Sequence, residues 1–377
     1  MVFTAIVVEP LISPRPVDGA DGRMHLVYEL SFVNETTVMS RIDSITAFDP
    51  ATNATLGEWK GDDLKAIFRL NGREPGVSLA RGHSGYAFLD ATPAKGALIP
   101  KTIRHRISTT RFMTSPDDEH KGVPLDPKLG VAAQATFEGA DVEVDPHKAV
   151  VIAPPLRGPG WVDTNGCCRS LGHRGAVMAF NGKAFVPERF AIDFVQLDSA
   201  RRLFVGSRQQ NESYPTYGNP VFAVVDGVVV EASDGASEQV PFAPREPPAI
   251  ETAAGNHVVL DIGNGNFVLF AHLKTGTVVV KQGDRVKAGQ VIGHVGDTGN
   301  SDAPHLHFHV MDGPSPLAAN GVPYAFTSFL GAGQLNPDSA DDMFAKGEPA
   351  AIDAGWLAGG HAAELPLDGE IVDFPAQ

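Results

Sequence analysis

The stretch that most constrains the fold of this chain runs from residue 302 to residue 311. It reads Asp-Ala-Pro-His-Leu-His-Phe-His-Val-Met, so that His305, His307 and His309 alternate with apolar residues. A period of two predicts a β-strand on which the three imidazoles share one face, about 6.5–7 Å apart. One imidazole can then hold a metal while the next reaches a bound water or a substrate, and neutral imidazole suits Zn²⁺. The pattern favours a functional site over a half-exposed strand whose polar face happens to be histidine.

Composition places the chain among globular proteins of mostly β structure. Its 377 residues, 43% hydrophobic and 20% charged, suffice for two domains with a core in each. Forty glycines and 29 prolines favour short strands joined by tight turns. The net charge of −15 argues against nucleic acid as a partner, because phosphate binding needs a basic surface. No apolar run approaches the ~18–20 residues that cross a bilayer, so no membrane span is expected.

The first part of the chain, residues 1–153, is expected to be an accessory β-sandwich. Apolar and polar residues alternate, at least in part, in several segments separated by Asp, Asn, Gly and Pro clusters. These segments are residues 23–34, 38–48, 84–91, 101–112 and 131–145. The pattern predicts an immunoglobulin-like sandwich. Because no cluster of catalytic residue types occurs here, we expect a packing or binding role.

A join rich in proline and glycine, residues 154–161, marks the domain boundary. Residues 154–330 are predicted to form a Gly-rich antiparallel β-sheet of barrel-like kind with almost no helix, which makes the chain all-β. Residues 331–377 are predicted to be an irregular C-terminal tail that packs on the domains, with room for a short helix at 340–346.

The pair Asn181-Gly182 lies between two apolar runs and predicts a tight hairpin. Such a hairpin brings His173 close to Asp193, although a bulge is needed to put both side chains on one face. The chain's two cysteines, at positions 167 and 168, are adjacent, which excludes a disulfide framework. Two small buried hydrophobes are the favoured interpretation; a distorted ring or a metal-binding thiolate are the alternatives.

Several motifs together resemble the lysostaphin-like zinc endopeptidases, which cut the peptide cross-links of bacterial peptidoglycan. The resemblance covers residues 218–310 closely and reaches back to residue 193. Its motifs are Ala-Ile-Asp193, Gly-Asn-Pro-Val-Phe-Ala-Val-Val-Asp-Gly-Val-Val from residue 218, Phe-Ala-His272-Leu, Gln-Gly-Asp-Arg-Val-Lys-Ala-Gly-Gln-Val-Ile-Gly from residue 282, and Gly-Asp-Thr-Gly-Asn-Ser-Asp-Ala-Pro-His305-Leu-His307-Phe.

The resemblance implies a role for each matching position. Asp193 and His307 would bind Zn²⁺, with one coordination position left open for a water whose pKa the metal lowers to about 7. His305 would take the proton from this water and pass it to the leaving amine. His272 would stabilise the tetrahedral oxyanion. The implied substrate is a peptidoglycan peptide, so we expect periplasmic or extracellular action, although the N-terminal residues do not form a complete signal peptide.

One position departs from the family pattern. The family's first zinc ligand is a histidine four residues before the aspartate, and this chain has Arg189 there. Arginine cannot lose its proton to become a ligand, and two unit charges 4 Å apart repel by about 4 kcal/mol at an effective dielectric of 20. Arg189 must therefore point away, and another residue must supply the third ligand. His173 is the best substitute, Cys168 is a weaker one, and His309 lies farther along its strand.

Three functions remain open at the level of sequence. The first is a zinc endopeptidase with His173, Asp193 and His307 as metal ligands. The second, suggested by Arg189, is a catalytically inactive relative that binds cell wall or regulates a partner enzyme. The third is a biotinyl- or lipoyl-type carrier domain, which is disfavoured because it leaves the histidines unexplained. The bond that is cleaved and the oligomeric state are left open.

Overall fold

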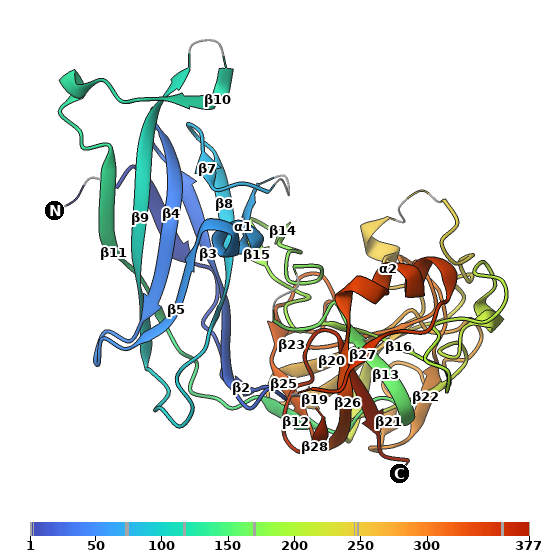
Figure 1. The fold of residues 1–377 in the computed structure, drawn as a ribbon. Helices are drawn as coiled ribbons and strands as arrows, with labels where there is room; N and C mark the ends of the chain where they lie inside the picture. Colours follow the sequence, from blue (N-terminus) through green and yellow to red (C-terminus); the bar gives the residue numbers. More distant parts are fainter. Residues whose placement is uncertain are drawn as a thin grey trace. The chain divides into compact units, whose positions relative to one another are not determined.

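The computed structural model describes the chain except for residues 1, 3, 72–74, 116–117, 169–170, 245, 247–248, 356–357 and 377. It divides into two compact units, one formed by Met1–Pro16 with Arg23–Lys148 and the other by Val17–Gly22 with Ala149–Gln377 (Figure 1). Both units are mostly β, as expected from the sequence. Among the described residues, no helix has the length and apolar character needed to cross a membrane. The assignment of functional domains to residues 1–153 and 154–330 stays a prediction.

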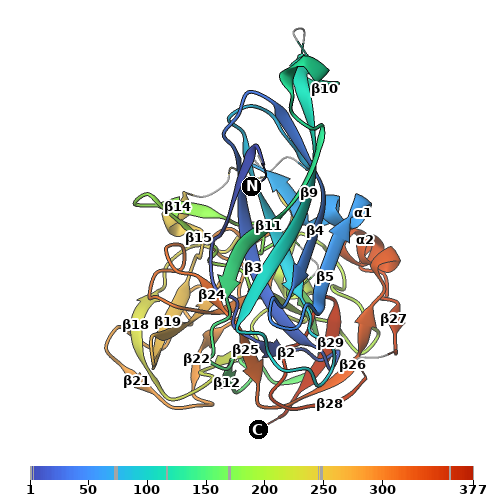
Figure 2. The same cartoon turned by 90° about the vertical axis from the view of Figure 1, so that its left-hand side faces the viewer.

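The first unit consists of antiparallel sheets that share one hydrophobic core (Figure 2). One sheet has the strand order β1-β3-β8-β6, and the other has the order β10-β9-β4-β5, with β11 paired to β9 and β7 to β4. Tyr28 and Phe32 from β3 meet Ile45 from β4 and Ile107 from β9 in this core, all fully buried. The immunoglobulin-like topology stays a prediction. The elements are β1 (Ile6–Pro10), β3 (Met24–Asn34), β4 (Met39–Phe48), β5 (Thr55–Lys60), α1 (Gly61–Ile67), β6 (Phe68–Leu70), β7 (Ser78–Leu79), β8 (Ser84–Ala91), β9 (Thr102–Ser115), β10 (Asp118–Val123), η1 (Pro127–Leu129) and β11 (Gln134–Glu143).

The second unit is built on a twelve-stranded sheet of antiparallel pairs. Its order is β21-β18-β19-β20-β23-β16-β13-β29-β26-β27, with β24 paired to β23 and β28 to β26. Figure 2 shows β18 and β19 side by side at one end of this order. The elements are β2 (Val17–Asp18), β12 (Val150–Ile152), β13 (Gly158–Thr164), β14 (Met178–Phe180), β15 (Lys183–Phe185), β16 (Ile192–Gln196), η2 (Asn211–Ser213), β17 (Pro220–Phe222), β18 (Gly227–Ser233), η3 (Ile250–Thr252), β19 (His257–Gly263), β20 (Asn266–Ala271), β21 (Arg285–Val286), β22 (Val291–His294), β23 (Leu306–Met311), β24 (Gly321–Val322), β25 (Tyr324–Phe326), β26 (Phe329–Leu335), α2 (Pro337–Lys346), β27 (Ile352–Asp353), β28 (Gly359–His361) and β29 (Glu370–Phe374).

The C-terminal residues are regular rather than irregular, so the predicted tail at 331–377 is wrong. Strand β29 pairs with both β13 and β26, which places it inside the sheet. The helix α2 is longer than expected and has defined ends, because the Asn336 side chain accepts a hydrogen bond from the backbone N–H of Asp338 and Pro337 occupies the first turn. Gly347 ends the helix in a left-handed conformation.

Strand β23 lies in the middle of the sheet and is buried on both faces. One face carries Phe308, whose ring lies 5.3 Å from the rings of Phe270 and Tyr324. The other face carries His307 and His309, which are 6% and 1% exposed. The predicted strand is confirmed for His307 and His309, whose face is enclosed rather than half-exposed, whereas His305 lies directly before β23. A packed aromatic layer therefore backs the strand that carries the histidines.

Glu370 in β29 gives a test of how tightly the C-terminal strand is packed. It is fully buried, and burial raises the pKa of its carboxyl from 4.5 to about 8. The folded protein therefore keeps a proton that the unfolded chain has lost over this range. The free energy of unfolding should fall as the pH rises from 4.5 to about 8, by up to ~1.4 kcal/mol per pH unit from this group.

In the variant Glu370→Gln, this contribution is removed, and we expect a flatter dependence of stability on pH. Urea unfolding at pH 5 and pH 8 measures the difference, with the exposed Glu251→Gln as the matched control. A wild-type decline that persists unchanged in Glu370→Gln would contradict the account.

Candidate metal centre

The centre begins with a pair of side chains on neighbouring strands. Asp193 of β16 and His307 of β23 are register partners, so their side chains project from the same face of the sheet. His307 Nδ1 lies 3.0 Å from Asp193 Oδ1, and His173 Nε2 lies 3.1 Å from Asp193 Oδ2. One ligand atom from each of these three residues lies within 4.8 Å of the others. The structure thus brings together the three residues that the sequence offered as metal ligands.

His173 reaches Asp193 by a route that differs from the expected one. The predicted hairpin is confirmed: Phe180 pairs with Lys183, and Asn181 and Gly182 form the turn with φ values of 51° and 76°. Strand pairing in this hairpin, however, is limited to residues 178–180 of β14 and 183–185 of β15, so it does not extend to His173. The His173 ring is instead fixed by Nδ1–H, which donates to the carbonyl of Ala191 at 3.0 Å. This leaves Nε2 to face Asp193.

Sequence reasoning missed two residues that hold Asp193 in place. Asn165 Nδ2 donates to Asp193 Oδ2 at 3.0 Å, and the Thr164 hydroxyl donates to the Asp193 carbonyl at 2.7 Å. Thr164 is the partner of Asp193 in the pairing of β13 with β16. No motif marks this pairing, because the two strands are joined through the His173 segment and their register becomes visible only in the folded sheet.

His272 and His305 lie beside these three residues. His272 directly follows β20 with a φ of 60°, a left-handed conformation that residues other than glycine rarely adopt and that is concentrated at functional sites. Its Nδ1–H donates to the Thr298 carbonyl at 2.7 Å, and the Nδ1–H of His305 donates to the Ala303 carbonyl at 2.8 Å. The two rings lie 4.7 Å apart, and His305 Nε2 lies 3.3 Å from Asp193 Oδ1. All five predicted site residues therefore form one cluster.

A second link behind His305 was not anticipated. The Ser301 hydroxyl donates to Asp297 Oδ1 at 2.5 Å, and Ser301 Oγ lies 3.2 Å from His305 Nδ1. The hydroxyl and the Ala303 carbonyl together fix the orientation of the His305 ring, with Nε2 turned toward Asp193.

The charges of the cluster are set by burial and chiefly by the carboxylate of Asp193. Burial alone would raise the pKa of Asp193, but the imidazoles of His173 and His305 hold it well below its usual value. Burial alone would lower the pKa of His173, but Asp193 raises it to about 9. The pKa of His272 is lowered well below its usual value by burial and by the neighbouring His305 and His307. The carboxylate is thus ionised and attracts positive charge, as a cation site requires.

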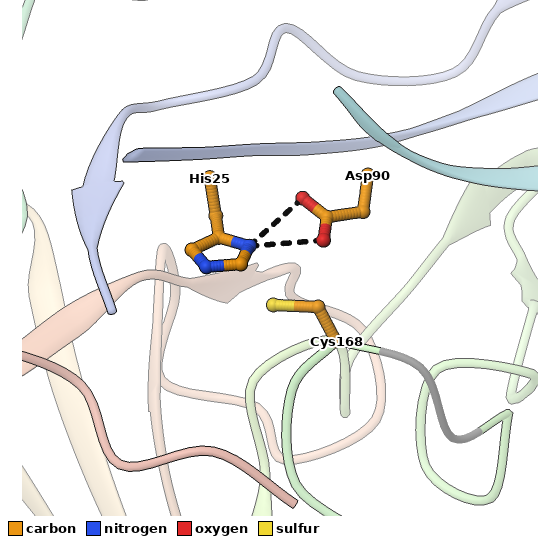
Figure 3. A group of neighbouring side chains, drawn as sticks. All are labelled: His25, Asp90 and Cys168. Carbon is orange, nitrogen blue, oxygen red and sulfur yellow. Dashed lines mark hydrogen bonds and ion pairs between the residues drawn. The ribbon is translucent and has the colours of Figure 1, made fainter. Parts of the chain in front are cut away.

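The other two ligand candidates, Cys168 and His309, are not among the residues whose ligand atoms converge with those of Asp193. His309 instead contacts Nε2 of His307, on the side of that ring away from Asp193. Arg189 lies in the turn before β16 and is buried, with 3% exposure. Cys168 forms a disulfide with Cys167, so neither the thiolate ligand nor the favoured pair of free buried cysteines is correct. Figure 3 shows His25 and Asp90 of the first unit, where His25 Nδ1 lies 3.1 and 2.9 Å from the two carboxylate oxygens.

The donor set fits a zinc ion. Tetrahedral zinc binds imidazole nitrogen and carboxylate oxygen at ~2.0–2.2 Å, which corresponds to roughly 3.3–3.6 Å between donor atoms. The 3.0 and 3.1 Å contacts of Asp193 with His307 and His173 are close to this spacing. Because Nδ1–H of His173 is engaged by a carbonyl, Nε2 is the nitrogen left to coordinate a metal, which would displace its proton.

The fold and the cluster define a β-sheet protein with a candidate centre of two histidines and one carboxylate. Residues 213–319 match the sequence profile of Peptidase family M23. The resemblance to the lysostaphin-like peptidases is therefore confirmed over this segment, which contains His272, His305 and His307. Asp193 and His173 precede it.

Curated relatives are similar over part of the chain. The glycyl-glycine endopeptidase ALE-1 of Staphylococcus capitis is 32% identical over 138 residues, which are 36% of this chain and 33% of the relative. The peptidoglycan DD-endopeptidase ShyA of Vibrio cholerae is 34% identical over 102 residues, 27% of this chain and 20% of the relative. The chain thus spans a third or less of these relatives. The solved catalytic domain of lysostaphin from Staphylococcus simulans is 29% identical, covers 38% of this chain and 80% of that chain, and has a TM-score of 0.22.

Proposed function

We propose that the protein is a zinc-dependent endopeptidase that hydrolyses peptide bonds of peptidoglycan cross-links. The observation that carries the proposal is the convergence of His173, Asp193 and His307, with His272 and His305 beside them. The substrate class follows from relatives named as glycyl-glycine and DD-endopeptidases. Because peptidoglycan lies outside the cytoplasm, the protein would act in the periplasm or outside the cell.

Three side chains would hold the metal. His173 would bind through Nε2, Asp193 through a carboxylate oxygen and His307 through Nδ1, the atoms that face one another in the structure. When bound, zinc supplies a Lewis acid that lowers the pKa of a coordinated water to about 7 and polarises the scissile carbonyl. Asn165 would keep the carboxylate oriented, since it donates to the oxygen that also faces His173.

His272 and His305 would move the protons. Each ring donates its Nδ1–H to a backbone carbonyl. The neutral form of each ring therefore has no proton on Nε2, and this nitrogen can accept one from the water. Only a protonated ring can donate from Nε2 to the oxyanion or to the leaving amine. Asp193 favours the protonated form of His305. We therefore assign proton donation to His305. His272, whose pKa is lowered by burial, would act in its neutral form as a proton acceptor, whereas the resemblance gave it the role of stabilising the oxyanion.

The test combines metal analysis with a cleavage assay. Purified protein reconstituted with zinc should hold one zinc per chain and cleave the cross-links of isolated peptidoglycan. After muramidase digestion, liquid chromatography and mass spectrometry measure the conversion of cross-linked to uncross-linked muropeptides. His173→Ala should lose both properties, while His257→Ala, a histidine of β19 outside the cluster, should keep them. A wild-type protein that stays metal-free after reconstitution would rule the proposal out.

A second candidate is a non-catalytic relative that binds the wall or regulates a partner enzyme. The observation that favours it is Arg189, which stands where the family has a ligand histidine. It predicts binding to isolated peptidoglycan without loss of cross-links, and the same wall binding for His305→Ala as for wild type. We place this non-catalytic role second because His173 completes a set of three candidate metal ligands with Asp193 and His307.

A further inference from the structure

His309 lies directly behind His307 and has no part in the reaction proposed above. The two residues are on the same face of β23, with ring centroids 5.1 Å apart and ring planes at 87°. His309 Nδ1 lies 3.0 Å from His307 Nε2, the ring nitrogen that points away from Asp193. His309 is 1% exposed, so this contact is shielded from water.

The positions of the protons on the two rings depend on each other. If a metal takes the lone pair on Nδ1 of His307, the single proton of that neutral ring must be on Nε2. That N–H then points at His309 Nδ1, which has to be bare in order to accept it. Donation of the second N–H to a fixed acceptor orients a metal-binding imidazole and raises its basicity.

The other nitrogen of His309 argues against a purely structural role. His309 Nε2 has no hydrogen-bond partner among the residues that the structure describes. A buried polar group without a partner costs about 1–3 kcal/mol, and an aliphatic side chain opposite Leu269 would avoid this cost. An aliphatic side chain could fill the space of His309, but it could not accept a hydrogen bond from Nε2 of His307. The contact of His309 Nδ1 with His307 is thus what distinguishes histidine at this position.

We propose that His309 is a positioning residue that holds His307 in the tautomer with a bare Nδ1 and thereby tightens zinc binding. The inference rests on the proposed zinc site and adds a supporting residue to it.

The test uses two variants of nearly equal shape. His309→Leu removes the acceptor, whereas His309→Asn keeps an oxygen acceptor close to the position of Nδ1. Zinc affinity is measured by competition with a chromogenic chelator, with Val310→Ala on the opposite face of β23 as the control for lost packing. We expect the dissociation constant to rise about 10–100-fold in His309→Leu and to stay close to that of wild type in His309→Asn and Val310→Ala. Equal affinity of His309→Leu and wild type would overturn the inference.

A second measurement does not depend on whether the variants fold. In zinc-loaded wild type labelled with ¹⁵N in the histidine rings, long-range ¹H–¹⁵N spectra should show the proton on Nε2 in both His307 and His309. A proton on Nδ1 of His309 would overturn the inference while leaving the zinc site standing. Wild-type protein that binds no zinc would instead overturn the proposed function, and this inference with it.

Discussion

Asp193→Asn is expected to abolish zinc uptake and peptidase activity while the protein remains folded. The carboxylate of Asp193 contacts His173, His305 and His307 together. The amide has nearly the same shape but carries no charge and binds zinc poorly. Replacing a residue that only supports a metal ligand lowers metal affinity by about 10–100-fold. Because Asp193 would itself be a ligand, the loss of zinc affinity should be larger than this.

Metal content and the chelator competition assay measure this loss, and circular dichroism reports the fold. The matched control is Asp198→Asn, which changes an aspartate just beyond β16 that pairs with Arg202 and lies outside the cluster. Zinc bound at full stoichiometry and with wild-type affinity by Asp193→Asn would contradict the account of the site.

His305→Ala is expected to separate chemistry from metal binding. Its Nε2 faces Asp193 at 3.3 Å, and its Nδ1–H is engaged by Ala303, so the ring is held in place to transfer protons. Its removal should lower kcat/KM by about 10²–10⁴-fold, the usual contribution of a general acid–base group. The zinc content should stay at that of wild type, because His173, Asp193 and His307 are unchanged.

Rates of cross-link cleavage and zinc content are measured on the same preparation. His257→Ala serves as the control, because it removes a buried histidine of β19 that lies outside the cluster. Full activity of His305→Ala would exclude a catalytic role for His305, and loss of zinc would show that it acts as a ligand instead.

Local patterns in the sequence predicted the parts of the site that depend on short-range structure. The alternation at residues 302–311 predicted that His305, His307 and His309 share one face of a strand, because the side-chain period of a strand is fixed at two. This holds for His307 and His309, whereas His305 directly precedes β23. The Asn-Gly pair predicted the turn between β14 and β15, because both residues tolerate positive φ. Motif similarity brought Asp193 and His272 into the same site.

Long-range pairing accounts for most of what the sequence did not reveal. The contact of Asn165 with Asp193 depends on the register of β13 with β16, and no local pattern specifies a register between separate segments. The disulfide between Cys167 and Cys168 was considered but not favoured. The capping residues of α2 were a local signal that the sequence analysis missed. Asn336 and Pro337 mark the start of this helix, and Gly347 marks its end.

The central claim is that His173, Asp193 and His307 bind one metal ion between them. The most direct measurement is a crystal structure of the zinc-loaded protein with anomalous difference maps recorded above and below the zinc absorption edge. We predict one zinc peak at ~2.0–2.2 Å from His173 Nε2, a carboxylate oxygen of Asp193 and His307 Nδ1. A zinc peak bound by other residues, or none at this position with the His173 ring turned away from Asp193, would contradict the claim.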